Sequence, residues 1–287
     1  MLFGLLDAAA LVFSVASMLS VGLGTTVQEL IGRLGNGNRI ARALIANFVL
    51  VPLLAYAIAN LLGLDPPLRT GLMLLGMAAG APFVIKLSEV AAQDVGTAGT
   101  LLVLLLPSTV LYLPLVAPLV LPNVTVTVTA IAIPLLISML LPLMLGLLAR
   151  AWLPRSALRL QPMMGAIATV ALIVLVFFTF ILNLPQIIAL FGTGAILAAT
   201  LLVAGAFAIG FLVGDDRGVM GLGTAQRNIA AATIVATQSI DELGTLSMVV
   251  VTALIGMAVL FPIARHLEKN AEARVWDLYD SKLTGRG

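Results

Sequence analysis

The stretch "GLGTAQRNIAAATIVATQ" (residues 221–238) consists almost entirely of small and apolar residues, yet Gln226, Arg227 and Asn228 stand side by side near its middle. The stretch "GLMLLGMAAGAPFVIKLSEVAAQD" (residues 71–94) has the same character and holds Lys86. An arginine or lysine at the centre of a bilayer costs about 2.5–3.5 kcal/mol. If these stretches cross a membrane, each cation needs a physical reason to be there.

The composition is that of a membrane protein with several spans. Of the 287 residues, 61% are hydrophobic and 10% are charged, and the mean hydropathy is +1.16, whereas soluble domains keep about a quarter of their residues charged. The charges form short clusters separated by uncharged runs, each long enough for one or two helices of about 20 residues. Because these runs are apolar on all sides rather than alternating, they exclude a β-barrel and predict an all-α membrane protein.

The uncharged runs, with turn signals at residues 122–123 and 183–185, predict nine transmembrane helices. Their approximate bounds are residues 4–31, 41–62, 69–92, 96–121, 127–150, 161–182, 187–213, 217–239 and 243–265. We expect one transmembrane domain over residues 1–268, with inverted halves at about 1–121 and 161–268 and a connecting helix at 127–150. A cytoplasmic tail follows at residues 269–287, and the segment 265–287 is predicted to form an interfacial helix.

The basic residues predict the orientation of the chain. With nine helices, twelve of the fifteen Lys and Arg residues fall on one face of the membrane. They are Arg33, Arg39, Arg42, Arg150, Arg155, Arg159, Arg217, Arg265, Lys269, Arg274, Lys282 and Arg286. The positive-inside rule therefore places the N-terminus outside and the C-terminus in the cytoplasm, and we expect a multi-pass protein of the plasma (inner) membrane.

Of the three other cations, Arg69 falls on the opposite face, and Lys86 and Arg227 lie in the two spans that contain the clearest helix breakers. Gly76, Gly80 and Pro82 precede Lys86, and Gly218, Gly221 and Gly223 precede Arg227. The two spans run in opposite directions across the membrane. A pair of interrupted helices in inverted halves is typical of the central site of a secondary transporter.

The charge of these two spans predicts an anionic substrate. Each cation is expected in the first turn after a break, where the helix N-terminus already carries about half a positive charge. Glu29, Glu89 and Asp94 lie near the cytoplasmic ends of their spans, so no acid is expected at mid-depth. An anion held between Lys86 and Arg227 would relieve the repulsion, and the planar arginine fork suits a carboxylate. Alternatively, Lys86 extends toward the cytoplasm and pairs with Glu89.

Several motifs resemble the bile acid:sodium symporter family. They are "SVASMLSVGLGTT" (14–26), "NFVLVPLLA" (47–55), "GAPFVIKLSEVAAQDVG" (80–96) and "LGTAQRN" (222–228). The resemblance implies a core bundle and a panel with the substrate between them, the crossover backbone including Gly80, Pro82, Gly221 and Gly223. It also implies transport of organic anions, from bile acids to pantoate-like carboxylates, with two sodium ions.

The sodium ligands that the family would supply are missing at the matching positions. The Ser-Asn pair of the family falls on Val84 and Ile85, and its glutamate on Leu222; its glutamines fall on Gln226 and Asn47. Because hard cations need oxygen ligands, we expect sodium coupling to be weakened or absent. In an alternative interpretation, the Arg227 guanidinium occupies the vacated sodium position. It then links the two interrupted helices through backbone carbonyls without touching substrate.

The combined prediction is a secondary transporter of a small organic anion that works by alternating access. Its predicted substrate-binding residues are Asn47, Lys86, Gln226, Arg227 and Asn228. Asn47, Gln226 and Asn228 equally suit the satisfaction of freed backbone groups at the breaks. A sodium-coupled symporter with relocated ion sites, and an anion sensor or channel on the same fold, remain open alternatives.

Other function classes are disfavoured. The chain has no cysteine and one histidine, His266, and its spans hold no cluster of acids, so we expect neither an enzyme nor a metal site. No cofactor is expected. The sequence leaves open whether sodium binds, whether transport is coupled to protons, and in which direction the substrate moves. The expected partners are the small anionic substrate and the lipid bilayer, without nucleic acid, and both a monomer and a homodimer fit.

Overall fold

A computed structural model describes residues 2–35, 37–121, 128–182, 184–236 and 242–284, and throughout these ranges the secondary structure is helical. The elements are α1 (Leu2–Gly24), α2 (Val27–Leu34), α3 (Gly37–Ile45), η1 (Ala46–Leu50), α4 (Val51–Leu61), α5 (Pro66–Met77), α6 (Val84–Val90), α7 (Val95–Val120), α8 (Val128–Leu135), η2 (Leu136–Leu140), α9 (Leu141–Trp152), α10 (Pro154–Leu182), α11 (Leu184–Ala189), α12 (Ala195–Val213), α13 (Arg217–Ala225), α14 (Ile229–Ala236) and α15 (Glu242–Thr284). The segments η1 and η2 are π-helical.

Six helical segments of the described chain are long and apolar enough to cross a membrane. They are Gly37–Leu61, Val95–Val120, Ala132–Trp152, Pro154–Leu175, Ala195–Val213 and Leu243–Ala271. The other three predicted spans correspond to α1, whose apolar part is Ala8–Gly24, and to the two helix pairs α5/α6 and α13/α14, whose members are too short to cross alone. The chain is thus an all-helical, multi-pass membrane protein, while the count of nine spans stays a prediction.

Both predicted interruptions occur, but the second lies later than expected. The first leaves residues 78–83 outside regular helix, so Gly80 and Pro82 lie in it and Gly76 remains in α5. The second comprises residues 226–228, after α13 has passed through Gly218, Gly221 and Gly223. The assignment of Gly221 and Gly223 to irregular backbone was therefore wrong. These glycines provide room for packing, because a Cβ on Gly221 would lie 2.8 Å from the Phe207 ring and one on Gly223 2.4 Å from Leu101.

Each π-helical segment precedes a proline by two residues. In η1 the N–H of Val51 bonds to Ala46 O, and in η2 the N–H of Leu141 bonds to Leu136 O, both with the wider π spacing. The same spacing would pair Asn47 O with the nitrogen of Pro52, which carries no hydrogen. The carbonyl of Asn47 is therefore free to bond elsewhere, as is common at π-bulges near functional sites.

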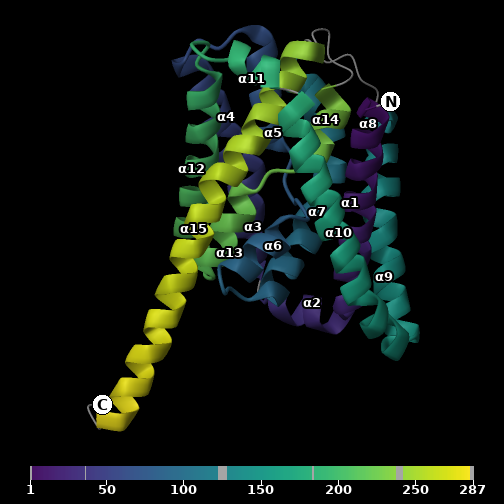
Figure 1. Cartoon of the computed structure of the whole chain (residues 1–287), viewed down its shortest axis with the longest axis vertical. Helices are drawn as coiled ribbons and strands as arrows, with labels where there is room; N and C mark the ends of the chain where they lie inside the picture. Colours follow the sequence, from purple (N-terminus) through teal and green to yellow (C-terminus); the bar gives the residue numbers. More distant parts are fainter. Residues whose placement is uncertain (1, 36, 122–127, 183, 237–241, 285–287) are drawn as a thin grey trace.

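The helices pack into two groups that lie side by side in Figure 1. In one group α1 lies against α9 and α10. In the other, α12 and α15 pack around α4, α5 and α13, and α6 and α7 pack against α13. The contact of α1 with α9 depends on two glycines, because a Cβ on Gly22 would lie 2.4 Å from Leu143 O and one on Gly146 2.7 Å from Leu19 O. Such close backbone approach is the usual way in which helices associate in lipid, where van der Waals packing replaces the hydrophobic effect.

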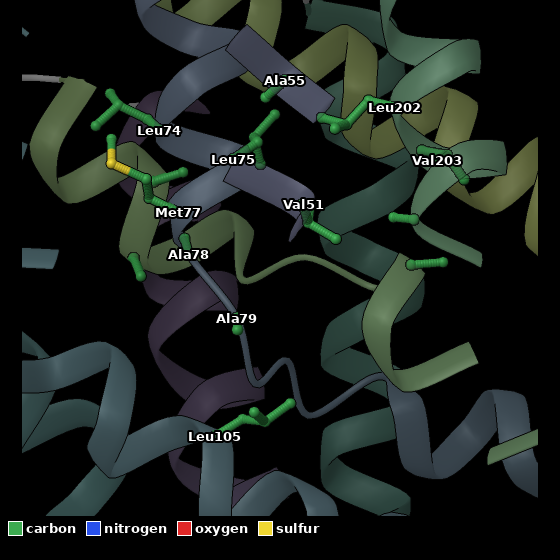
Figure 2. Close-up of a cluster of buried hydrophobic side chains, with 14 of the residues drawn as sticks. Val51, Ala55, Leu74, Leu75, Met77, Ala78, Ala79, Leu105, Leu202 and Val203 are labelled. Carbon is green, nitrogen blue, oxygen red and sulfur yellow. The ribbon is translucent and has the colours of Figure 1, made fainter. Parts of the chain in front are cut away.

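The first break starts in a completely buried part of the molecule. Leu74, Leu75, Ala78 and Ala79 are completely buried. Figure 2 shows Ala78 and Ala79 on the irregular segment that follows α5, with Val51 and Leu202 on the neighbouring helices. The irregular backbone is thus shielded from lipid, which is the condition under which broken helices are tolerated in membranes.

Ion pairs gather at the end of the molecule where α2 lies. Arg33 of α2 pairs with Asp94, which also caps α7 through the N–H groups of Gly96 and Thr97. Arg39 and Arg42 of α3 both pair with Asp215, at 2.9 and 2.7 Å. Hydrogen bonding to Arg39, and the nearby charges of both arginines, hold the pKa of Asp215 below its ordinary value.

The start of α1 and the end of α15 lie at opposite ends of the molecule, and α15 extends away from the rest in Figure 1. This agrees with an odd number of spans, although the assignment of each end to a side of the membrane stays a prediction. The segment expected as a separate interfacial helix is instead the direct continuation of the last span, because α15 runs unbroken from Glu242 to Thr284.

Candidate functional site

The two breaks contact each other through Asn228. Its N–H donates to Ala78 O at 2.9 Å, and its Nδ2 donates to Gly80 O at 3.0 Å. Its Oδ1 accepts the N–H of Ala231 at 3.0 Å, which is the hydrogen bond of a helix N-cap. Asn228 thus starts α14 and ties it to the first break.

The first break is also held by Thr109 of α7. Its hydroxyl accepts the N–H of Ala79 at 3.1 Å and donates to Ala79 O at 2.9 Å, so one side chain satisfies both polar groups of a buried residue. The adjacent Gly80 has φ +75, and a Cβ there would lie 2.8 Å from Leu106 N. Only glycine fits this position without strain.

Arg227 lies in the second break and is buried, with 3% of its surface exposed. Its guanidinium donates five hydrogen bonds to oxygens of three segments. Nε bonds to Leu75 O at 2.9 Å. Nη1 bonds to Asn47 Oδ1 at 2.8 Å and to Thr224 O at 3.0 Å. Nη2 bonds to Gly76 O at 2.7 Å and to Asn47 O at 3.4 Å. A guanidinium has five N–H groups, so every donor is used.

The oxygens around Arg227 are available because they lie where helical hydrogen bonding stops. Leu75 and Gly76 belong to the last turn of α5, and Thr224 belongs to the last turn of α13. The last carbonyls of a helix lack their regular partner, although Leu75 O also accepts the N–H of Ala78 at 3.2 Å, and Asn47 O is left free by Pro52. The arginine side chain thus caps two helix C-termini and a π-bulge at once.

The electrostatics of Arg227 are opposite to those expected from the sequence. The side chain was predicted in the first turn of a half-helix, where the N-terminal dipole repels a cation. It precedes α14 and bonds instead to carbonyls at helix C-termini, where the partial charge is negative. Carbonyl dipoles therefore stabilise the charge, and all five hydrogen-bond partners are uncharged.

Lys86 occupies a different environment. It lies on α6, about one-third exposed, with Nζ 2.9 Å from Glu89 Oε2. It lines a cavity of about 230 Å³ between the two groups of helices, whose walls come from α1, α6, α7 and α10. Ser17, Gln161 and Thr169 contribute polar groups to the lining. The exposed lining residues Glu89 and Gly24 place its opening at the α2 end of the molecule.

The structure brings some of the predicted site residues together. Asn47 bonds to Arg227, and its Nδ2 donates to Ala43 O and to Thr224 Oγ1. Asn228 lies next to them, and Gln226 is buried with no hydrogen bond to its side chain from any described residue. Lys86 lines the cavity, which none of the other four lines. The geometry favours the linking role of Arg227 and the Lys86–Glu89 pairing, while direct substrate binding by any of the five stays a prediction.

Several residues at the breaks were not predicted from the sequence. Thr109 and Thr224 are buried and hydrogen-bonded there, Tyr112 donates to Phe48 O, and Met139 of η2 accepts from Asn228 Nδ2 at 3.4 Å. The one available signal was the presence of hydroxyl groups in apolar spans next to prolines, as in "LPSTVLYLP" (106–114). Such residues commonly satisfy backbone groups that proline leaves free.

Comparison with known proteins identifies the family of the chain. Residues 11–190, more than half of the chain, match the model of the sodium bile acid symporter family; the match ends before Arg227. A comparison with curated proteins gave no match. Proteins of the matched family are sodium-dependent or related secondary transporters rather than enzymes. The chain therefore belongs to the sodium bile acid symporter family.

Proposed function

We propose that the protein is a carrier of a small organic anion of the carboxylate type that works by alternating access without requiring sodium. The observation that carries this proposal is the cavity of about 230 Å³ between the two groups of helices. Of the described residues that line it, only Lys86 is positively charged. A space between two packed groups changes shape when one group moves against the other, as alternating access requires.

The pairing of Lys86 with Glu89 leaves it available to a substrate. Both side chains are partly exposed, and an exposed pair at this helical spacing contributes about 0.2–0.5 kcal/mol. A hydrogen bond to a charged group in a less exposed site contributes about 1.5–3 kcal/mol. A carboxylate that enters the cavity can therefore displace Glu89 from the ammonium of Lys86.

The proposal that transport does not require sodium rests on the contacts of Arg227. Carbonyls at helix ends would be the natural ligands for a coupling cation. Here these carbonyls already accept hydrogen bonds from the Arg227 guanidinium. A sodium ion at this place would have to displace an arginine that is held by five hydrogen bonds.

The test is a thermal-shift screen of the purified protein with the carboxylates acetate, pantoate and cholate, each in sodium and in choline buffer. At least one carboxylate is expected to raise Tm equally in both buffers. Lys86→Ala is expected to weaken that carboxylate about 10- to 100-fold, which corresponds to the loss of one charged hydrogen bond. Lys269→Ala, which removes an exposed lysine of α15, serves as the matched control.

Stabilisation only in sodium buffer would contradict the proposed coupling, and unchanged affinity of Lys86→Ala would contradict the binding site. Counterflow of the labelled carboxylate in proteoliposomes then distinguishes a carrier from a sensor or a channel, because only a carrier exchanges one bound molecule for another.

A further inference from the structure

The oxygens that surround the Arg227 guanidinium form a site for a cation. Four are backbone carbonyls, of Asn47, Leu75, Gly76 and Thr224, and the fifth is Asn47 Oδ1. The distances from the guanidinium nitrogens run from 2.7 to 3.4 Å. Convergent oxygens from unwound backbone and helix C-termini are the ligands with which membrane transporters hold small monovalent cations.

We infer that Arg227 is a built-in cation that permanently fills this oxygen site, and that removing its side chain exposes a site for a free guanidinium or sodium ion. The inference deepens the proposed independence from sodium, on which it rests, by giving it a structural cause. It concerns the resting protein without substrate, so it is measured separately from transport.

The oxygens would remain in place after the side chain is removed because other contacts hold them. Asn47 is fixed by hydrogen bonds from its Nδ2 to Ala43 O and Thr224 Oγ1. Leu75 and Gly76 lie in a fully buried turn of α5, and the break that follows is bound to Thr109 and Asn228. A vacated site would therefore present unpaired buried acceptors, which are costly to leave unsatisfied.

A packing role alone makes a different prediction from a cation role. If Arg227 only fills space, an apolar side chain of similar length would replace it and small cations would have no effect. If it acts as a cation, the apolar replacement leaves the oxygens unpaired and also blocks the ion. Arg227→Ala and Arg227→Met therefore separate the two roles.

The experiment measures Tm of the purified full chain as guanidinium chloride, sodium chloride or choline chloride is varied at constant ionic strength. Arg227→Ala is expected to have a lower Tm than the wild type. Its Tm is expected to rise with guanidinium, by a constant step for each tenfold increase of the guanidinium concentration above its Kd. Sodium is expected to act in the same direction and choline to have no effect. The wild type, Arg227→Met and the exposed-arginine control Arg217→Ala are expected to show no such gain.

If Arg227→Ala does not fold, Arg227→Ser provides the same test, because its small side chain also leaves room for the ion while its hydroxyl can donate one hydrogen bond to the oxygens. Equal responses of wild type and variants to guanidinium and sodium would overturn the inference, as would the absence of any rescue in a folded variant. A rescued variant with no carboxylate binding in the wild type would leave the cation site standing and refute only the proposed substrate.

Discussion

Single residues in this protein show that a buried charge needs oriented dipoles rather than an opposite charge. Arg227 has no carboxylate among its hydrogen-bond partners, yet each of its five N–H groups has an oxygen, and three of these oxygens lie at helix C-termini. The cost of burying the ion is offset by acceptors that, apart from Leu75 O, would otherwise lack partners among the described residues. The broken helices therefore provide the acceptors that Arg227 needs, and Arg227 provides donors to the carbonyls at the helix ends.

Gly80 is a residue at which a single added methyl group is expected to be costly. Its φ of +75 strains any other residue by about 1–2 kcal/mol, and a Cβ would also lie 2.8 Å from the backbone nitrogen of Leu106. Gly80→Ala is thus expected to lower Tm clearly in a detergent melt. Gly32→Ala, on α2 with open space around its Cβ position, is expected to leave Tm equal or slightly higher. Equal behaviour of the two variants would contradict the described backbone.

Helix ends, rather than helix interiors, carry the specific interactions at the scale of secondary structure elements. Thr26 and Glu29 form a capping box at the start of α2, and the hydrogen bonds from Thr26 hold the pKa of Glu29 below its ordinary value. Asp94 starts α7 and links it to α2 through Arg33. Burial alone would raise the pKa of Asp94, but hydrogen bonds from Thr97, Arg33 and Gly96 outweigh it and the pKa is lowered.

The two roles of Asp94 can be separated by substitution. Asp94→Asn keeps an N-cap acceptor and loses the ion pair, which for a half-exposed pair costs about 0.2–1 kcal/mol. Asp94→Ala loses the cap as well, at a further cost of about 0.5–2 kcal/mol. Thermal melts at neutral pH are expected to rank the wild type above Asp94→Asn and Asp94→Ala lowest; if Asp94→Ala matched Asp94→Asn, the capping role would be refuted.

The same pair gives a pH dependence with a defined sign. Because the folded pKa of Asp94 lies below the ordinary value of 3.8, its stabilisation is complete above that value and is lost as pH falls through the folded pKa. The advantage of the wild type over Asp94→Asn is therefore expected to shrink between about pH 5 and about pH 3. Melts across this range measure it, and an advantage that grows toward acid pH would contradict the assignment.

At the scale of the whole molecule, the cavity between the helix groups opens at the end that carries the ion pairs. Because the native chain has no cysteine, single introduced cysteines report access without background labelling. Ser17→Cys, in the cavity wall, is expected to react with a membrane-impermeant maleimide faster from the cytoplasmic side. Thr193→Cys, exposed before α12 near the opposite end, is expected to react only from outside.

Labelling of Thr193→Cys only from the cytoplasmic side would reverse the predicted orientation. Exclusive labelling of Ser17→Cys from one side, at all times and with all carboxylates, would contradict alternating access. The unmodified chain, which has no thiol, provides the baseline for both measurements.

The sequence by itself determined the elements of the fold. Its long uncharged runs predict the helices because a bilayer core tolerates neither charge nor unpaired backbone, and Pro82 with Gly80 marks the first break because proline lacks an N–H and glycine tolerates positive φ. The second break was predicted too early in the chain, because Gly221 and Gly223 remain in α13, where neighbouring side chains fill the space that their missing Cβ atoms leave. Only the tertiary structure decided the role of Arg227. The sequence gives the charge of a side chain, but the electrostatic field around that charge depends on which helix ends lie next to it. The carbonyls of residues 47, 75, 76 and 224 come together only when the chain has folded.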